Sequence, residues 1–338
     1  MKKIVCITMA FCLLLLAACS SSTTSKDSTS GNKGSQTKKP YVLKMNMVPA
    51  STDVTFSYWQ DFAKELEKES KGTLKVEVYP TETLGKTTDM IQAISQGTPI
   101  LQDSDPSHLA DYVPDFAIFM HPYLFKKPED IEKAWKSEVG QRLSKDLEKK
   151  GLKVVTLVYF GTRHLISDKK VVTREDTKGM KIRNAPTKMW NEVSKTLGGN
   201  PTNTAWSEVY TALSQGVADA AEGPLSLIYS SKLYEAKDHI SLTGHLVATT
   251  SIVMSKQVYD SLPKDAQKAI DKVGQAYPAK RAKLITALEK DFQKKLEAEG
   301  VKFNEVDKEG FIEASKKVSD AFPEWTPGLY DEVLKAIQ

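Results

Sequence analysis

The chain has 338 residues, with 47 basic and 43 acidic side chains and a formal net charge of +4 at pH 7. Basic and acidic residues are mixed throughout, without the basic stripe typical of nucleic-acid-binding proteins, so we expect no nucleic-acid partner. All three cysteines lie near the N-terminus, at Cys6, Cys12 and Cys19. The rest of the chain is therefore expected to have no disulfide, no thiolate metal site and no cysteine nucleophile.

Residues 1–18 are predicted to be a lipoprotein signal peptide. Lys2 and Lys3 form a basic start, and the apolar run at 4–16 is too short to span a bilayer comfortably. Leu16-Ala17-Ala18-Cys19 has the form of a bacterial lipobox, in which the cysteine is diacylated. Residues 19–39, polar after the cysteine, predict a flexible tether between lipidated Cys19 and a folded domain. An ordinary signal peptide that happens to contain a cysteine is the alternative.

From residue 40 onward, strands and helices are predicted to alternate. Strands are expected at 41–47, 73–79 and 152–160, and helices around 59–66, at 87–96 and, as one long helix, at 128–150. A Lys- and Glu-rich helix from Pro263 to Gly300, with a possible kink at Pro278, is long enough to run across two lobes. This alternation predicts an α/β fold with a mainly parallel sheet. No second long apolar segment follows the leader, so no later membrane span is expected.

The chain shows none of the enzyme motifs that we sought. It has no G-x-S-x-G, Walker, H-E-x-x-H or G-x-G-x-x-G pattern, and its five histidines form no i,i+4 pair, so we expect neither a metal nor a cofactor. Asp103 and Asp105 lie on the same side of an extended segment. The simpler interpretation is a solvated loop. The alternative that we keep open is the acid/base pair of a secreted lyase or hydrolase.

Two arginines are placed where an anion could be held. Arg163 comes just after the apolar run at 152–160, and Arg183 ends a short strand at 180–183. Ligands bind at strand ends in open α/β sheets. A guanidinium presents a planar fork that matches a carboxylate at two points, which a lysine cannot do. A carboxylate site is the functional hypothesis, although an arginine at a strand end is more often a surface charge.

The segment Asp176-Thr177-Lys178-Gly179-Met180-Lys181-Ile182-Arg183 resembles the D-L-K-G-x-K-I-R signature of one family. This is the DctP-type solute-binding family of TRAP transporters, the tripartite ATP-independent periplasmic systems. The likeness continues through 197–202 (LGGNPT) and 206–219 (WSEVYTALSQGVAD) and covers about residue 41 to the C-terminus. Other similar features are Val113-Pro114, the Pro-Tyr-Leu-Phe at 122–125 and the Ser-Leu-Pro at 261–263.

The resemblance implies a two-lobed, periplasmic-binding-protein-like (type II-like) fold, with a ligand cleft between the lobes and a long C-terminal helix spanning both. Lobe I would comprise residues 40–160 and 249–285, and lobe II residues 161–248 and 286–338. The lipid-anchored, extracytoplasmic protein would capture an organic acid, without catalysis, for the membrane subunits of an ion-gradient-driven TRAP transporter. A subunit that reports to a membrane sensor kinase is an alternative with the same fold and site.

The resemblance also assigns roles to individual residues. Arg183 would clamp the ligand carboxylate, Arg163 would be the second arginine of the cleft, and Trp206 would pack on the ligand. Gly223 stands where the family commonly has a ligand-contacting asparagine, so that amide contact is absent or supplied elsewhere.

A second departure from the family pattern concerns carboxylates. The family often has an aspartate two or three residues after the position of Gly97, whereas here Pro99 and Ile100 follow and Asp103 and Asp105 come later. Because carboxylates accept hydrogen bonds from hydroxyl groups, these two would suit a hydroxylated or sugar acid.

Overall fold

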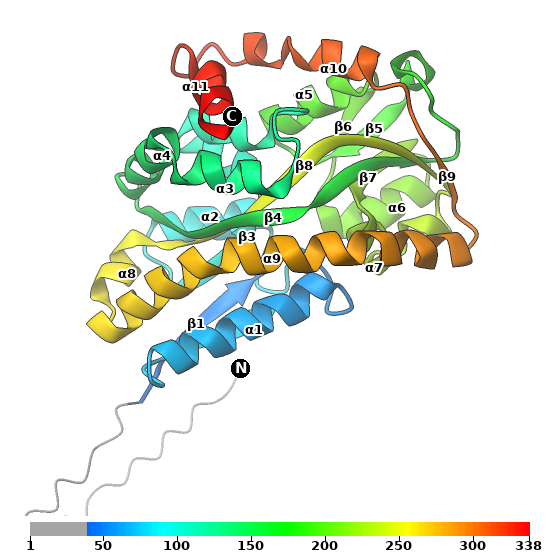
Figure 1. Cartoon of the computed structure of the whole chain (residues 1–338). Coiled ribbons are helices and arrows are strands. Elements are labelled where there is room, and N and C mark those ends of the chain that lie inside the picture. The colour runs from blue at the N-terminus through cyan, green and yellow to red at the C-terminus, as the bar shows by residue number, and fades with distance from the viewer. Residues whose placement is uncertain (1–38) are drawn as a thin grey trace, which may run out of the picture. The chain divides into compact units, whose positions relative to one another are not determined.

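The computed structural model describes residues 39–338 (Figure 1). The predicted signal peptide, Cys19 and all but the last residue of the predicted tether lie outside the described residues. Within residues 39–338, no helix combines the length and the apolar character that crossing a membrane requires.

Strands and helices alternate along most of the described chain. The strands are β1 (Tyr41–Asn46), β2 (Leu74–Tyr79), β3 (Ile100–Ser104), β4 (Leu152–Ser167), β5 (Lys181–Asn184), β6 (Asn200–Asn203), β7 (Ala220–Pro224), β8 (His239–Ser255) and β9 (Lys302–Asn304). The α-helices are α1 (Val54–Glu69), α2 (Thr87–Ser95), α3 (Pro128–Lys136), α4 (Glu138–Glu148), α5 (Lys188–Thr196), α6 (Val209–Ser214), α7 (Leu225–Ser230), α8 (Lys256–Ser261), α9 (Lys264–Ala298), α10 (Glu309–Ser315) and α11 (Leu329–Ile337). Three of the short 3₁₀ helices matter below: η1 (Pro106–Asp111), η2 (Pro114–Met120) and η4 (Trp206–Glu208).

One mixed sheet joins these strands in the order β2-β1-β3-β8-β4-β7-β5-β6, with β9 beside β8. The long strands β4 and β8 pair antiparallel and form its centre, seen as the green and yellow strands of Figure 1. The pairs toward the two ends of the sheet, β1 with β2 and β5 with β6, are parallel. The prediction of a mainly parallel sheet is therefore wrong at the centre. The sequence analysis did not identify β8, which runs back along β4 and so reverses the strand direction there.

The two ends of the sheet carry separate helices and apolar clusters, giving a two-lobed α/β fold. The cluster beside β1 and β2 contains α1 side chains and Tyr277 of α9. The cluster beside β7 contains α6 side chains together with Phe292 and Leu296 of α9. Because this one 35-residue helix contributes to both clusters, the prediction of a long helix spanning both lobes is confirmed (Figure 1).

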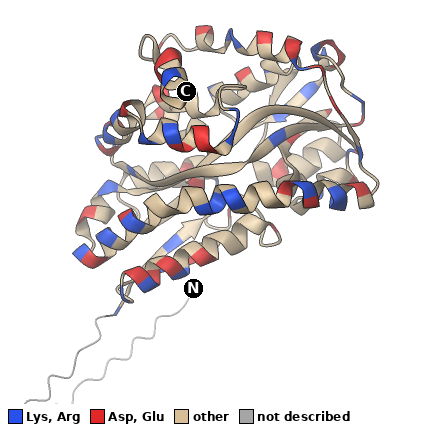
Figure 2. Cartoon of the chain, viewed as in Figure 1, with Lys and Arg blue, Asp and Glu red and all other residues tan. Residues whose placement is uncertain are grey.

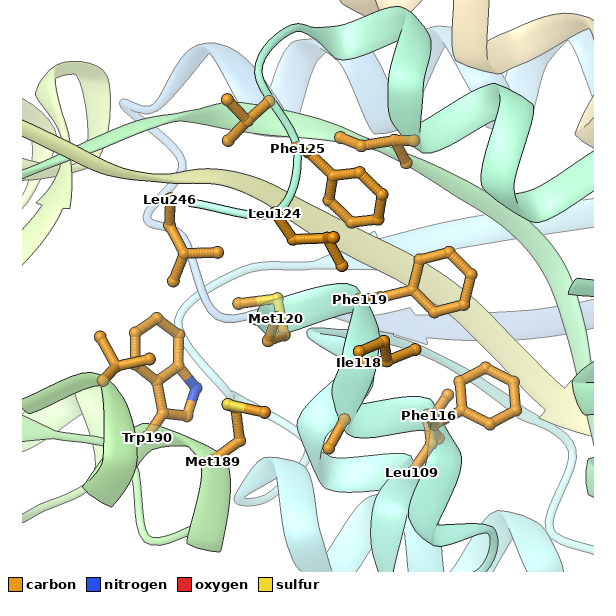
Figure 3. Close-up of a cluster of buried hydrophobic side chains, with 14 of the residues drawn as sticks. Leu109, Phe116, Ile118, Phe119, Met120, Leu124, Phe125, Met189, Trp190 and Leu246 are labelled. Carbon is orange, nitrogen blue, oxygen red and sulfur yellow. The ribbon is translucent and has the colours of Figure 1, made fainter. Parts of the chain in front are cut away.

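A third apolar cluster joins segments of the two predicted lobes. Figure 3 shows Met189 and Trp190 of α5 in the same cluster as Phe119 and Met120 of η2, and all four side chains are buried. Such shared apolar burial stabilises the arrangement at roughly 25 cal/mol per Å² removed from water. The cluster therefore holds α5 where its Trp190 can reach the cavity described below.

Charged side chains of both signs occur along α1 and α9 (Figure 2). Neither helix as a whole carries one sign of charge, in agreement with the mixed charge of the sequence.

The predicted single helix at 128–150 is two helices. The chain breaks at Ser137, whose ψ of 173° is extended and whose hydroxyl donates to the Ala134 carbonyl at 2.7 Å. A Cβ at Gly140 would lie 2.0 Å from the carbonyl oxygen of Trp135, so α4 approaches α3 more closely than any side chain would permit. The periodic apolar pattern continues across the break and did not reveal it.

Candidate functional site

A cavity of about 140 Å³ lies among residues of both predicted lobes. Its lining comes from the loop before α2, the end of β3, the middle of β4, β5, β7, α5 and η4. The volume is close to the roughly 150 Å³ of an engineered apolar cavity that binds benzene. The cavity therefore suits a single small molecule.

Arg183, the residue predicted to clamp the ligand, lines this cavity from β5 and is 3% exposed. Its Nε donates to Thr204 Oγ1 at 3.3 Å and its Nη2 to the Thr204 carbonyl at 2.6 Å. Burial lowers the pKa of Arg183 to about 10, although the nearby Glu222 carboxylate opposes the shift. The side chain thus remains a cation at neutral pH, and the two Thr204 bonds use two of its five N–H groups.

Trp206, predicted to pack on the ligand, lies in η4 and also lines the cavity. The guanidinium of Arg183 lies 4.9 Å from the centre of its ring. The indole N–H donates to Ser231 Oγ at 3.1 Å, which fixes the ring orientation. The stacked ring and the Thr204 bonds together hold the Arg183 fork in one direction.

Arg163, the second predicted arginine, lines the cavity but is already paired. It lies inside β4, because this strand continues to Ser167 through a register shift between Tyr159 and Gly161, whereas the sequence analysis ended the strand at 160. Its Nη2 donates to Glu222 Oε1 at 2.7 Å and to the Glu222 carbonyl at 3.1 Å, and its Nε bonds Oε2. The fork that could bind a second ligand carboxylate is therefore occupied by Glu222.

Glu222 is 1% exposed and receives a further bond from His245 Nε2 at 3.3 Å. Burial alone would raise the pKa of Glu222, but the Arg163 charge and the hydrogen bonds from His245 and Arg163 lower it to about 2. Gly223, predicted at the ligand contact, is buried in β7 and is not among the residues that line the cavity. The residue of β7 that lines the cavity is Glu222, while a Cβ at Gly223 would lie 3.7 Å from the ring of Trp206, another lining residue.

Asp105, another predicted ligand contact, lines the cavity at the start of η1. Its Oδ1 accepts from the Ser107 N–H at 2.9 Å, its Oδ2 accepts from the Trp190 indole at 3.2 Å, and His108 Nδ1 lies 3.1 Å away. Burial would raise the pKa of Asp105, but the charge of His108 and these hydrogen bonds outweigh it and hold the pKa below its usual range. Its carboxylate oxygens are thus already engaged by protein donors.

Asp103 is buried at the end of β3, so the interpretation of residues 102–106 as a solvated loop is wrong. One oxygen accepts from the Trp59 indole at 3.1 Å and the other from the Thr250 hydroxyl. Burial raises the pKa of Asp103 to about 6, against the opposing effects of Thr250 and the nearby Arg281 charge. Across residues 39–338, no three His, Cys, Asp or Glu side chains are grouped so that they could hold a metal ion.

Asp103→Asn is expected to change how stability depends on pH. Between about pH 4 and pH 6, folded Asp103 keeps a proton that the unfolded chain has lost, so the wild type loses stability as pH rises through this window. The unfolding free energy of the variant minus that of the wild type should therefore rise by about 2–3 kcal/mol across the window. Asparagine can keep both bonds, since its oxygen accepts from Trp59 and its amide donates to Thr250.

Urea unfolding of both proteins from pH 4 to pH 7 measures this difference. Burial lowers the pKa of His121, His164 and His245, so these histidines make stability fall as pH drops, the opposite direction. Subtracting the unfolding free energy of the wild type at each pH removes the contribution of these histidines, since both proteins contain them. A difference that stays flat over the whole range would contradict the raised pKa of Asp103.

Several cavity residues were not proposed from the sequence. Glu82 and Lys86 come from the loop before α2, Trp190 from α5 and Glu222 from β7. Glu222 directly precedes the departure noted at Gly223, and this adjacency is the signal that could have identified it. The loop residues carried no such signal, because only the tertiary arrangement brings them beside Arg183.

Polar contacts near the cavity join segments of the two predicted lobes. Trp190 of α5 donates to Asp105, as described above, and Thr187 Oγ1 donates to Ser107 Oγ at 3.0 Å. At the exposed side, Lys86 Nζ lies 3.3 Å from Glu208 Oε1. Four of the five predicted site residues that lie within residues 39–338 therefore meet around one cavity whose walls are bonded to each other.

Comparisons with known proteins agree with this architecture. Residues 45–324 match the family described as bacterial extracellular solute-binding protein, family 7 (DctP). The 2,3-diketo-L-gulonate-binding periplasmic protein YiaO of Escherichia coli is 29% identical over 87% of this chain and 90% of its own length. The C4-dicarboxylate-binding periplasmic protein DctP of Rhodobacter capsulatus is 31% identical over 69% of this chain and 71% of its own length.

A solved structure shows the same fold. The TRAP periplasmic solute-binding protein from Ochrobacterium anthropi, with bound L-fuconate, superposes with a TM-score of 0.85 at 30% identity, covering 88% of this chain and 99% of that chain. The match of residues 45–324 and the lobes and central sheet described above confirm the resemblance found in the sequence. The chain therefore belongs to the DctP family of extracellular solute-binding proteins, the family of the TRAP periplasmic binding proteins.

Proposed function

We propose that this protein is the extracytoplasmic solute-binding lipoprotein of a TRAP transporter and captures an organic acid through Arg183. The observation that carries the proposal is a buried guanidinium, oriented by Thr204 and Trp206, that lines a cavity and has no carboxylate partner within residues 39–338. A buried cation without a counter-ion is costly, so an anionic ligand would supply the missing charge. The relatives named above bind organic acids according to their names, which agrees with this assignment.

The mechanism would be capture and not catalysis. Both oxygens of Asp103 accept hydrogen bonds from Trp59 and Thr250, and both oxygens of Asp105 accept from protein donors. Neither carboxylate is arranged as a free acid or base, which supports the binding role over the lyase or hydrolase. Recovery of chemically unchanged ligand after incubation with the protein and denaturation would exclude catalysis.

A thermal-shift screen of the mature domain tests the organic-acid assignment. We expect carboxylates that fit the cavity to raise the melting temperature in a concentration-dependent way, because a ligand that binds only the folded state stabilises it by mass action. The panel includes sn-glycerol 3-phosphate, since a guanidinium also binds phosphate. Uncharged analogues, such as the amides of the active acids, serve as controls. Equal shifts by acids and amides would contradict an anion site.

The delivery of the acid to TRAP membrane subunits is part of the same proposal. A sensor kinase would receive the same closed binding protein, so the cavity does not distinguish these partners. Deleting the gene in its host should abolish uptake of the ligand if the partner is a transporter. Unchanged uptake together with a lost transcriptional response would instead favour the sensor.

The lipid anchor at Cys19 is proposed from the lipobox Leu16-Ala17-Ala18-Cys19. Cys19→Ala is expected to move the protein from the membrane fraction to the soluble extracytoplasmic fraction and to abolish incorporation of labelled fatty acid. Cys12→Ala, within the same leader, is the matched control and should leave both unchanged. Continued fatty-acid labelling of the Cys19 variant would contradict the anchor.

A further inference from the structure

Four carboxylates line the cavity, and their hydrogen bonds distinguish them. Glu222, Asp105 and Asp103 have both oxygens engaged by protein donors, as described above. Glu82 is different. Its Oε1 accepts from the N–H of Thr87 at 2.9 Å and from its hydroxyl at 3.0 Å, whereas its buried Oε2 has no hydrogen-bond partner within the described residues. A buried carboxylate oxygen without a donor is unfavourable, so Glu82 is the cavity carboxylate with unused acceptor capacity.

The backbone holds Glu82 in place at some cost. Thr81 and Glu82 both adopt left-handed conformations, with φ of 57° and 52°, which residues other than glycine rarely do. Non-glycine residues in this region are strained and persist where the surrounding structure fixes them, often at ligand sites. The strained turn is therefore a second reason to look for a role of this side chain.

Hydrogen bonds around the turn explain why it keeps this conformation. The N–H of Glu82 donates to the Met47 carbonyl at 2.9 Å, and the N–H of Gly85 donates to the Glu82 carbonyl at 2.9 Å. The fully buried Asn46 bonds the two residues that end the turn, donating to the Gly85 carbonyl at 3.0 Å and accepting from the Leu84 N–H at 3.1 Å. Glu82, which lines the cavity, is therefore carried by a loop that these hydrogen bonds fix.

The other charges of the lining set what the ligand can carry. Arg163 pairs with Glu222, His108 with Asp105 and Lys86 with Glu208. Within residues 39–338, Arg183 is thus the cavity cation without a carboxylate within ion-pair distance. One ligand carboxylate would balance it. A second ligand carboxylate would face Glu82, whose free oxygen repels an anion and attracts a hydroxyl hydrogen.

We propose that Glu82 is a specificity-determining residue, which accepts a hydrogen bond from a ligand hydroxyl and so selects polyhydroxylated monocarboxylates, such as aldonates, over dicarboxylates and unsubstituted acids. The inference rests on the proposed function, because it requires the ligand carboxylate to bind at Arg183. The two residues come from opposite predicted lobes, Glu82 from lobe I and Arg183 from lobe II, so such a ligand would be held from both sides of the cavity.

Glu82→Gln is the variant that tests the proposal. Thr87 donates two hydrogen bonds at Oε1, so the glutamine oxygen takes that position and its NH₂ group replaces Oε2. The loop keeps its contact with Thr87, while the negative charge and the unpartnered acceptor Oε2 of this cavity-lining residue are lost. Glu67→Gln, an exposed position on α1, is the matched control for the loss of one charge.

Calorimetric titration with aldonates of four to six carbons, and with unsubstituted mono- and dicarboxylates of the same lengths, gives the readout. We expect the wild type and Glu67→Gln to bind an aldonate at least about tenfold more tightly than the matching unsubstituted acids. Glu82→Gln should reduce this preference about tenfold, through weaker aldonate binding and unchanged or tighter dicarboxylate binding.

The outcomes separate the two proposals. If the wild type binds a dicarboxylate or an unsubstituted acid as tightly as every aldonate, the selectivity proposal is wrong while the organic-acid function stands. Because this measurement uses the wild type, it does not depend on the folding of any variant. If Glu82→Gln keeps the wild-type preference, Glu82 does not determine the selectivity and the proposal is wrong. If no carboxylate binds the wild type, the proposed function itself fails.

Discussion

Arg183→Lys is expected to weaken binding of the best acid from the screen about tenfold to a hundredfold, nearly as much as Arg183→Ala. A charge-assisted hydrogen bond contributes about 1.5–3 kcal/mol, and each 1.4 kcal/mol is a factor of ten in affinity. With Nε and one N–H of Nη2 bonded to Thr204, the end of the guanidinium remains free for a two-point contact. A lysine ammonium cannot bond Thr204 and the ligand in the same planar arrangement.

Calorimetry on folded protein measures this loss, with Lys181→Ala as the control. Lys181 lies two residues away on the same strand, with its side chain exposed, so its removal should leave affinity unchanged. Matching melting curves for the variants without ligand would show that the effect is on binding. Wild-type affinity in Arg183→Lys would rule out the two-point clamp. Wild-type affinity in Arg183→Ala would show that the ligand carboxylate does not bind at Arg183.

Glu222→Gln is expected to reduce the free energy of unfolding by about 3–5 kcal/mol. The substitution keeps the shape of the side chain but leaves the Arg163 guanidinium, 6% exposed, without its counter-charge. Removing one partner of a buried ion pair has this large effect because the remaining charge stays out of water without compensation. Urea unfolding at neutral pH, where the Glu222 pKa of about 2 keeps the wild-type pair charged, measures the change.

The double variant Arg163→Met with Glu222→Met separates the charge from the packing. Replacing both members of a buried pair by apolar side chains is often neutral, so the double variant should be more stable than Glu222→Gln. Glu313→Gln, which breaks an exposed pair with Lys316, should cause no measurable change. A Glu222→Gln protein as stable as the wild type would show that water or another anion already compensates Arg163.

Much of the fold follows from local pattern. The strand at 180–183 appears within one residue of its predicted bounds, and α9 runs from Lys264 to Ala298 as the apolar spacing after Pro263 indicates. Both depend on side-chain periodicity and on Gly and Pro at the ends, which act over a few residues. The break at Ser137 was missed because it depends on the close approach of α3 and α4 at Gly140.

By itself the sequence determined the family and the presence of an arginine at the end of a strand, because the signature at 176–183 is contiguous. Only the tertiary structure decided which of the two arginines, Arg163 or Arg183, has no carboxylate partner within residues 39–338. Arg163 and Glu222 lie 59 positions apart, and Glu82 and Arg183 are separated further still, so their relation depends on strand register and loop conformation. Register is set by the burial of many side chains at once, and no short segment specifies it. The pairing of charges around the cavity could therefore be determined only from the tertiary structure.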